Sequence, residues 1–288
     1  MLTWQDFQTD EDKIPDFISQ MIAEHERNEA VEMARTADLY DHQRNKTVNE
    51  YVQKIYSSTG VSVQNYVASN NKIASNFFRR LNTQRCAYSL GNGVTFASDK
   101  DTNGKVKQGG GTKAKLGKTF DTELYRAGYL ALIHGVSFVF FNFDHIHVFP
   151  LTEFVPLWDE NDGTLRAGLR YWRIDDTKPT IAVLYTEDGY RRFKSKSGYA
   201  RFEKDGDLRA YKQTISKAPA DAEPEVIAEE NYSRLPIVPL WGSRLHQSTL
   251  VGLQQSIDSY DLIRSGFAND LQDCAQIYWI LENYGGMD

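Results

Sequence analysis

The apolar residues near the C-terminus follow a helical spacing over an unusually long stretch of chain. Successive members of this stripe lie three or four residues apart, with polar residues such as Gln254, Asp258 and Asn269 between them. A helix from Gln247 to about Ile280 would be roughly 50 Å long at about 1.5 Å per residue. A stripe of that length needs a partner, which is the sheet of its own chain, another subunit, or a segment absent from this chain. Its members are Leu250, Leu253, Ile257, Tyr260, Ile263, Phe267, Leu271 and Ala275.

The middle of the chain alternates apolar and polar residues with a period of two, which predicts β-strands. Turn signals such as Asn142, Pro150 and 187–189 separate the runs, so we expect an antiparallel meander. After an acidic, proline-bearing linker over 218–230, the two prolines of 235–240 favour an edge strand or an extended connector. The predicted strands of the meander are 136–141, 145–149, 153–157, 165–173, 181–186, 190–194, 199–203 and 208–215.

Three further segments have helical spacing. The first predicts one or two amphipathic helices that pack on the main domain or, alternatively, present a surface to a partner. The second has Asn70 or Asn71 as its N-cap, and the third ends at Gly135. We also expect a short strand at 94–96 and a polar loop at 98–118. The three helical segments are 14–40, 70–90 and 121–134.

The predicted helices and antiparallel strands together indicate an α+β fold, and the composition is that of a globular protein. Apolar residues make up 41% of the 288 residues, which is enough for a core. The formal net charge of −6 argues against tight, nonspecific nucleic-acid binding, which needs clustered Lys and Arg. Cys86 and Cys274 have no CxxC spacing. The N-terminus does not resemble a leader, and no run of about 18 apolar residues occurs, so we expect a protein made in a reducing cytoplasm or in a particle assembled there.

A histidine pair on a predicted strand has the residue types of a metal site. His145 and His147, at i and i+2, share one strand face, and His134 precedes them. The flanking Phe143 and Phe149 favour ordinary turn and strand residues instead. We therefore predict no metal ligand, while a β-rich, metal-dependent enzyme is kept as the alternative function.

The run Gly117-Lys118-Thr119 resembles the end of a phosphate-binding P-loop. That motif needs four residues between its first glycine and Gly-Lys, whereas five separate Gly111 from Gly117. The stretch 105–118 therefore predicts an exposed, locally basic loop, with contact to an anionic partner as the alternative. Because Gly-x-Ser-x-Gly and His-Glu-x-x-His are also absent, we predict no catalytic residue and no cofactor.

Three stretches are informative through their order and spacing. A helix leads into YSLGNGVTF at 88–96, a second helix leads into ALIHGVSF at 131–138, and LPIVPLW at 235–241 precedes IDSYDLIRSGFANDLQD at 257–273. In this order they resemble the portal proteins of long-tailed, siphovirus-type bacteriophages, the head-to-tail connectors. Gly93 stands where these proteins usually have proline. The resemblance covers about 44–288.

The resemblance implies a structural subunit that self-assembles into a ring, typically a dodecamer. Double-stranded DNA would pass through its channel into the capsid and out again, without sequence-specific binding. The implied partners are the terminase motor, head-completion and tail adaptors, and the scaffold and capsid proteins, with no membrane. The implied location is the capsid vertex of a virion assembled in the host bacterial cytoplasm, and the gene would belong to a phage or a prophage.

The resemblance also divides the chain. It implies an N-terminal helical segment at 1–43, an α/β wing body at 44–245, and a stem-like helix with the start of a clip region at 246–288. In the family a second stem helix, the channel loop and the crown follow, so the sequence resembles a portal protein truncated after its first stem helix.

The terminal helix then supplies two sets of candidate residues. Aspartates on its polar side could form an acidic channel wall, which would not bind DNA phosphates tightly. Alternatively, the same aspartates form an ordinary solvent-exposed helix face. A third possible function is an adaptor that binds a partner through 14–40. The channel-lining candidates are Asp258, Asp261, Asp270 and Asp273, and the subunit-packing candidates are Leu250, Leu253, Ile257, Tyr260, Ile263, Phe267 and Leu271.

Overall fold

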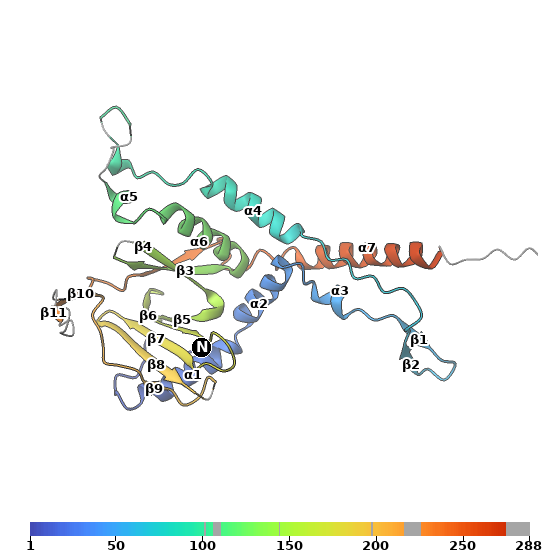
Figure 1. The fold of residues 1–288 in the computed structure, drawn as a ribbon, viewed down its shortest axis with the longest axis horizontal. Coiled ribbons are helices and arrows are strands. Elements are labelled where there is room, and N and C mark those ends of the chain that lie inside the picture. Colours follow the sequence, from blue (N-terminus) through green and yellow to red (C-terminus); the bar gives the residue numbers. More distant parts are fainter. Residues whose placement is uncertain (101, 106–110, 144, 197, 216–225, 275–288) are drawn as a thin grey trace, which may run out of the picture. The chain divides into compact units, whose positions relative to one another are not determined.

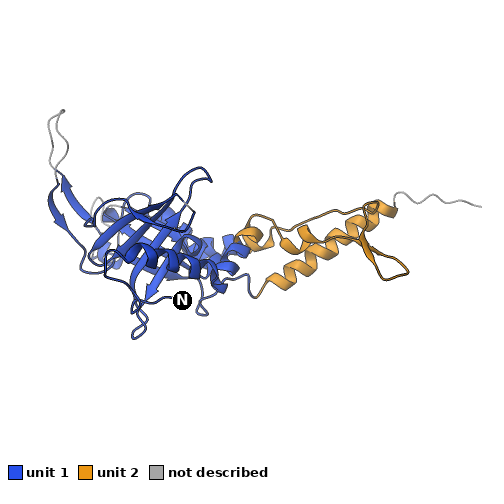
Figure 2. Ribbon diagram, turned by 90° about the horizontal axis from the view of Figure 1, so that it is seen from below, with its two compact units in different colours: residues 1–37, 82–251 blue, residues 38–81, 252–288 orange. Residues whose placement is uncertain are grey.

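The computed structural model describes residues 1–288 except 101, 106–110, 144, 197, 216–225 and 275–288. By its internal contacts the chain forms two compact units, each discontinuous in sequence (Figure 2). Unit 1 comprises 1–37 and 82–251, and unit 2 comprises 38–81 and 252–288. The α+β class is confirmed, because helices combine with antiparallel sheets (Figure 1). The three consecutive regions implied by the family resemblance stay a prediction.

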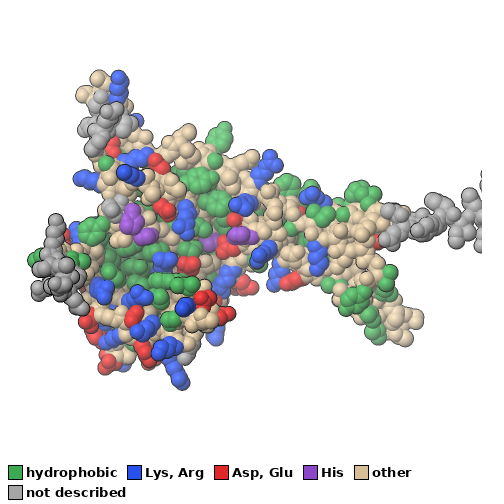
Figure 3. Space-filling view, viewed as in Figure 1, with side chains coloured by type: hydrophobic (Ala, Val, Ile, Leu, Met, Phe, Trp, Pro, Cys, Tyr) green, Lys and Arg blue, Asp and Glu red, His purple; other side chains and the backbone are tan. Residues whose placement is uncertain are grey.

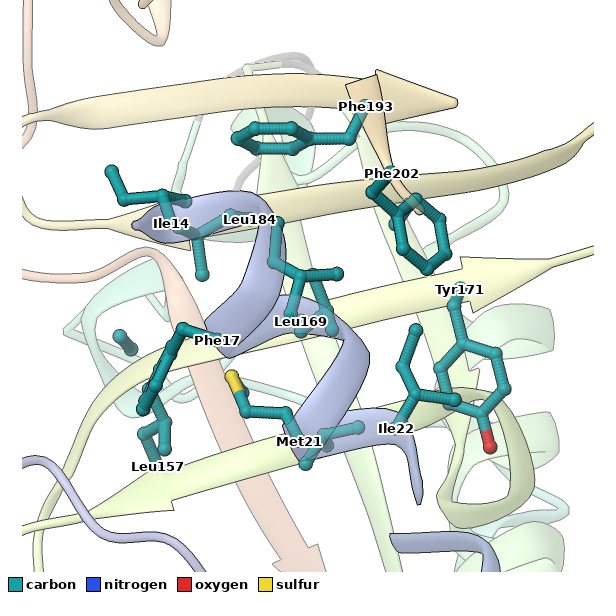
Figure 4. Close-up of a cluster of buried hydrophobic side chains, with 14 residues drawn as sticks. Ile14, Phe17, Met21, Ile22, Leu157, Leu169, Tyr171, Leu184, Phe193 and Phe202 are labelled. Carbon is teal, nitrogen blue, oxygen red and sulfur yellow. The ribbon is translucent and has the colours of Figure 1, made fainter. Parts of the chain in front are cut away.

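A five-stranded antiparallel sheet and helix α1 (Ile14–Glu26) enclose the first core of unit 1. Apolar residues of α1 recur every three or four positions, so one helix face meets the sheet. Alternate strand residues supply the other side, with Leu157, Leu169 and Leu184 pointing at the helix (Figure 4). The strands are β5 (Phe154–Trp158), β6 (Leu165–Trp172), β7 (Thr180–Thr186), β8 (Gly189–Ser195) and β9 (Glu203–Lys204).

The predicted helical segment 14–40 is confirmed as two helices. Helix α2 (Glu29–Asp41) follows α1 after a break at Asn28, whose side chain accepts a hydrogen bond from Ala30 N–H at 2.9 Å. Its Val31 joins the second core of unit 1. Helix α1 and the start of α2 therefore pack on the core of unit 1 and do not present a free surface to a partner.

A three-stranded sheet in the order β12-β3-β4 forms the second core with the other face of the five-stranded sheet. Aromatic residues dominate this core: the rings of Phe138 and Phe154 lie 4.4 Å apart. The predicted edge strand at 235–240 is confirmed as β12, which contains Pro239 and, among the strands that the structure describes, pairs with β3 alone. The strands are β3 (Val136–Asn142), β4 (His145–Pro150) and β12 (Ile237–Trp241).

Helix α6 (Phe120–His134) packs against the three-stranded sheet, as the 121–134 pattern predicts. It ends at Gly135, which has a φ of +89° that only glycine adopts freely. An added Cβ there would lie 2.9 Å from the backbone carbon of Gln247, so glycine is required for space as well. Two smaller elements precede α6: the 3₁₀ helix η1 (Ala97–Asp99) and α5 (Thr112–Lys115).

Several local predictions for the body are wrong. Of the predicted strand 199–203 only Glu203 lies in a strand, β9, and the predicted strand 208–215 begins at Lys212. The meander is not one sheet, because Pro150 and the 3₁₀ helix η2 (Leu151–Glu153) carry the chain from β4 of one sheet to β5 of the other. The stretch 94–96 is a connection rather than a strand, since Val94 N–H bonds the Asp121 carboxylate and not a neighbouring strand. The end of the linker 218–230 is strand β11 (Val226–Glu230), paired with β10 (Lys212–Ile215); its first part lies outside the described residues.

A partly buried polar network joins α1, α2 and β6. The Tyr171 hydroxyl donates to Glu26 Oε1 at 2.5 Å, lies 3.0 Å from His25 Nδ1, and Glu26 pairs with Arg35. The His25 side chain is 0% exposed. Burial, opposed by the Glu26 carboxylate, lowers the pKa of His25 from 6.5 to about 4.

Acid should therefore destabilise the protein through His25. Between pH 6.5 and about 4, His25 is protonated in the unfolded chain but neutral in the folded chain. The unfolding free energy is therefore highest above pH 6.5 and decreases as the pH falls towards 4. From pH 7 to pH 4.5 we expect the wild type to lose about 2 to 3 kcal/mol more unfolding free energy than His25→Gln. Urea titrations at both pH values measure this, and equal losses would contradict it.

Unit 2 contains α3 (Lys46–Glu50), a hairpin of β1 (Lys54–Tyr56) and β2 (Ser62–Gln64), the first turns of α4 (Phe77–Leu90), and α7 (Gln254–Cys274). Asn45 caps α3 through its side chain. The terminal helix begins at Gln254, seven residues later than predicted, because 247–253 form turns. Its predicted continuation to Ile280, including Ala275, lies outside the described residues.

Candidate functional site

Helix α7 buries a polar face within unit 2. Asp261, Ser265 and Asn269 are 0%, 5% and 3% exposed. They lie four residues apart and therefore share one side of the helix. An apolar face would be the usual side to bury, so these groups need hydrogen-bond partners.

The partner is the extended segment 69–75, which lies along α7. Ser75, Ile73 and Asn71 donate their backbone N–H groups to side-chain oxygens of Asp261 (3.0 Å), Ser265 (3.0 Å) and Asn269 (2.6 Å), in that order. Ser69 N–H continues the series to Asp273 at 3.3 Å. We call this row of bonds the polar seam.

The spacing of the polar seam follows from backbone geometry. Two residues of extended chain advance about 6.6 Å, and four residues of an α-helix advance about 6.0 Å. Every second N–H of the extended segment therefore meets every fourth side chain of α7. Because the N–H groups of 69, 71, 73 and 75 are satisfied by side chains, this side of the segment needs no neighbouring strand.

The polar seam explains why the helix predicted over 70–90 begins only at Phe77. The N–H groups of 71, 73 and 75 are engaged by α7, and an extended backbone cannot be helical at the same time. Asn71 is not an N-cap: its side chain donates to Asn269 and to Gln272. Sequence reasoning missed Ser265 and Asn269, although the polar period of four over 261–273 is visible in the sequence.

Three of the four candidate channel aspartates already accept hydrogen bonds within unit 2. Asp261 also accepts from Asn45 Nδ2 at 2.9 Å, and Asp273 accepts from the Ser69 hydroxyl at 2.5 Å. Asp258 accepts from Thr47 and from Tyr40. Burial, followed by the bond to Asp258, raises the pKa of the Tyr40 hydroxyl to about 12. Asp270 is exposed.

The apolar side of α7 is exposed from its second turn onward. Tyr260, Ile263, Phe267 and Leu271 are 45%, 73%, 64% and 58% exposed. We call these four residues the apolar stripe. The Phe77 ring packs edge-on against Tyr260 at 5.0 Å, so the first turn of α4 extends this surface. The remaining packing candidates are covered by their own chain: Leu250 and Ile257 are buried, and Leu253 is half-buried.

Ser265→Ala should open the polar seam locally. The change removes the acceptor of Ile73 N–H, which is worth about 1 to 1.5 kcal/mol, so the Ile73 amide should exchange about tenfold faster with deuterium. Ser259→Ala, on an exposed position of the same helix, is the control and should leave that amide unchanged. Equal exchange in both variants would show that the serine does not hold the segment.

The histidine pair forms a contact rather than a ligand cluster. His145 Nε2 and His147 Nε2 lie 3.0 Å apart, and burial together with His145 lowers the pKa of His147. Within the described part of the chain no group of three or more potential ligands occurs. His134 lies buried at the end of α6.

The described part of the predicted basic loop makes internal contacts. Lys113 pairs with Asp121 at 2.5 Å, and this bond lowers the pKa of Asp121. Asp99 accepts from the N–H groups of Thr112 and Lys113, which lowers the pKa of its carboxyl. Residues 106–110 lie outside the described residues. No helix among those described is both long and apolar enough to cross a membrane.

Comparison with known proteins identifies the family. The model of the phage portal protein family, SPP1 Gp6-like, matches residues 19–288. The chain belongs to this portal family. It is also similar to a portal protein of Clostridium phage phiCD119, with 26% identity over 251 residues that cover 80% of this chain and 52% of the relative. The chain thus spans about half the length of the curated relative it matches.

Membership confirms the resemblance read from the three ordered stretches. The portal family is structural rather than enzymatic, and its proteins are components of the phage particle. The β-rich enzyme that the histidine pair suggested therefore loses its support. Within a portal subunit, the feature of α7 that calls for explanation is its exposed apolar stripe.

Proposed function

We propose that this chain is a structural subunit of a portal ring, whose channel carries double-stranded DNA into the capsid during packaging and out during ejection. Family membership and the portal relative support this function. As in the family, the ring would hold typically twelve copies. It would sit at the capsid vertex, after assembly in the cytoplasm of the host bacterium.

The exposed apolar stripe is the observation that carries the proposal. In the polar seam, the segment 69–75 of the same chain covers one side of α7. The apolar stripe is not covered and can contact a partner. A ring is closed by a heterologous contact, in which one surface of each copy meets a different surface of the next. An apolar surface on a helix suits such a contact, because large exposed apolar patches mark interaction sites.

The acidic residues of α7 fit a channel wall on a third side of the helix. Asp270 is exposed and lies between the stripe and the polar seam; Asp273, about 60° away at 100° per residue, is also exposed, although it accepts from Ser69 at the end of the seam. Asp258 and Asp261 belong to the seam side, so we centre the lining proposal on the other two. Negative charge there would keep DNA phosphates from binding tightly during translocation.

The same ring would be the docking site for the terminase motor, the head-completion and tail adaptors, and the scaffold and capsid proteins. These partners follow from family membership and not from a contact in this structure.

Native mass spectrometry of the purified protein tests the proposal. A ring subunit should give one closed assembly of fixed copy number, and the interface should survive dilution to micromolar concentration. A protein that stays monomeric at every concentration and salt tested would rule the ring out.

A further inference from the structure

A second apolar surface of unit 2 lies on the β1–β2 hairpin and its flanks, residues 51–67, which we call the hairpin arm. Both strands are exposed along their whole length, and the hairpin pairs with no third strand among the described residues. Ile55 and Val63 form a cross-strand pair, yet they are 54% and 59% exposed. Figure 3 shows hydrophobic side chains gathered on this projection. A two-stranded hairpin is marginal in water unless something covers it.

The composition of the hairpin arm is that of an interface core. Its 17 residues include a single charged side chain, Lys54. Charged residues are depleted and tyrosine is enriched at the centres of protein interfaces. Exposed strands of free proteins are normally guarded by several charges or by proline, and the arm has no proline. This pattern favours a protein partner over solvent.

The exposed apolar area of the hairpin arm is a substantial part of what one partner contributes to a protein interface. Tyr51, Tyr56 and Tyr66 are 48%, 71% and 81% exposed. Because a buried aromatic side chain covers about 150 to 250 Å², these three alone present roughly 300 to 500 Å². That is about half of the roughly 800 Å² that each partner contributes to a standard interface. Val61 and Val67 extend the same surface, at 60% and 95% exposed.

We propose that the hairpin arm of one copy docks on the apolar stripe of a neighbouring copy. The inference rests on the proposed ring, because a ring supplies a second copy of this chain next to every arm. A heterologous contact needs two different surfaces on each subunit, and unit 2 carries two: the arm and the stripe. Both surfaces expose apolar side chains in the single chain. A contact between the arm of one copy and the stripe of the next would bury both surfaces.

Disulfide trapping between two differently tagged versions of the full chain tests this contact. Both versions carry Cys274→Ser, because Cys274 is exposed whereas Cys86 is buried. One adds Val63→Cys on the hairpin arm, and the other adds Phe267→Cys on the apolar stripe. After mixing and mild oxidation, the mixed disulfide should form at least about tenfold faster than in a control mixture, because docking raises the local thiol concentration.

The control mixture pairs Val63→Cys with Gln255→Cys, an exposed position of α7 that lies away from the stripe. Native mass spectrometry of the same samples reports assembly. Rings with the fast mixed disulfide support the docking. Rings in which Val63→Cys reacts no faster with Phe267→Cys than with Gln255→Cys overturn the docking and leave the ring intact. Absence of any assembly overturns both.

A chain that carries Val63→Cys and Phe267→Cys together tests whether the arm docks on the stripe of its own chain. If the arm folds onto the stripe of its own chain, oxidation gives an internal disulfide in the isolated monomer, and the inference is overturned. A bond that appears only between copies supports it. Ile55→Asp, on an exposed side chain, should raise the dissociation constant of the assembly about tenfold to thirtyfold. Ser58→Asp, in the polar turn, should leave the constant unchanged.

Discussion

Replacing Asp261 with alanine is expected to lower the unfolding free energy of unit 2 by about 3 to 5 kcal/mol, because two hydrogen bonds to a buried acceptor are lost. Asp261 accepts from Ser75 N–H at 3.0 Å and from Asn45 Nδ2 at 2.9 Å, and its side chain is 0% exposed. Both donors would be left without this acceptor. Asn45 also caps α3, so the substitution loosens α3 as well as the extended segment.

Two further variants separate the hydrogen bonds from charge and helix propensity. Asp270→Ala removes the same side chain from an exposed position of the same helix and should change the unfolding free energy by less than about 0.5 kcal/mol. Asp261→Asn keeps one acceptor oxygen and should fall between the two. Urea unfolding followed by circular dichroism gives the values. If Asp261→Ala were as mild as Asp270→Ala, the polar seam would contribute nothing to stability.

The double variant Ile263→Asp/Phe267→Asp should abolish ring assembly. Each side chain is more than 60% exposed in the single chain, so neither substitution creates a cavity or a buried charge in the subunit. In the ring each would place a carboxylate in an apolar contact. Central contact residues contribute about 2 kcal/mol each, so together the two changes should weaken the subunit contact roughly 1000-fold.

The control is Gln255→Asp, which adds one carboxylate at an exposed polar position of α7 away from the stripe and is compared with Ile263→Asp and Phe267→Asp taken singly and together. Sedimentation velocity compares the assemblies, and circular dichroism confirms that all of these variants fold. The control should assemble like the wild type. Normal rings from the stripe variant would show that subunits meet through other surfaces.

The sheet could be predicted from sequence because its information is local. Alternation with a period of two and turn residues such as Asn142 locate the strands β3 to β8 to within one or two residues. The split between β4 and β5 could not be predicted, since strand pairing depends on contacts between distant segments. The long amphipathic helix was also predicted, with its start misplaced by the turns at 247–253.

The candidate site was harder to predict because it depends on which side of α7 is covered. The sequence indicates an apolar stripe over 250–275, of which Tyr260, Ile263, Phe267 and Leu271 are exposed in the structure, whereas Leu250 and Ile257 are buried. It does not reveal that residues near 73 lie against residues near 265, a pairing across 192 positions of the chain. For the same reason the sequence predicts Asn70 or Asn71 as a helix cap, whereas the backbone and side chain of Asn71 both bond to α7. A tertiary contact here overrides a local helix pattern.

Cryo-electron microscopy of the assembled protein tests the central claim most directly, because it shows where each side of α7 points. We predict a closed ring around a channel, with Ile263 and Phe267 buried between neighbouring copies, the polar seam intact, and Asp270 facing the channel. Particles without a central channel, or rings in which Ile263 and Phe267 face solvent, would contradict it.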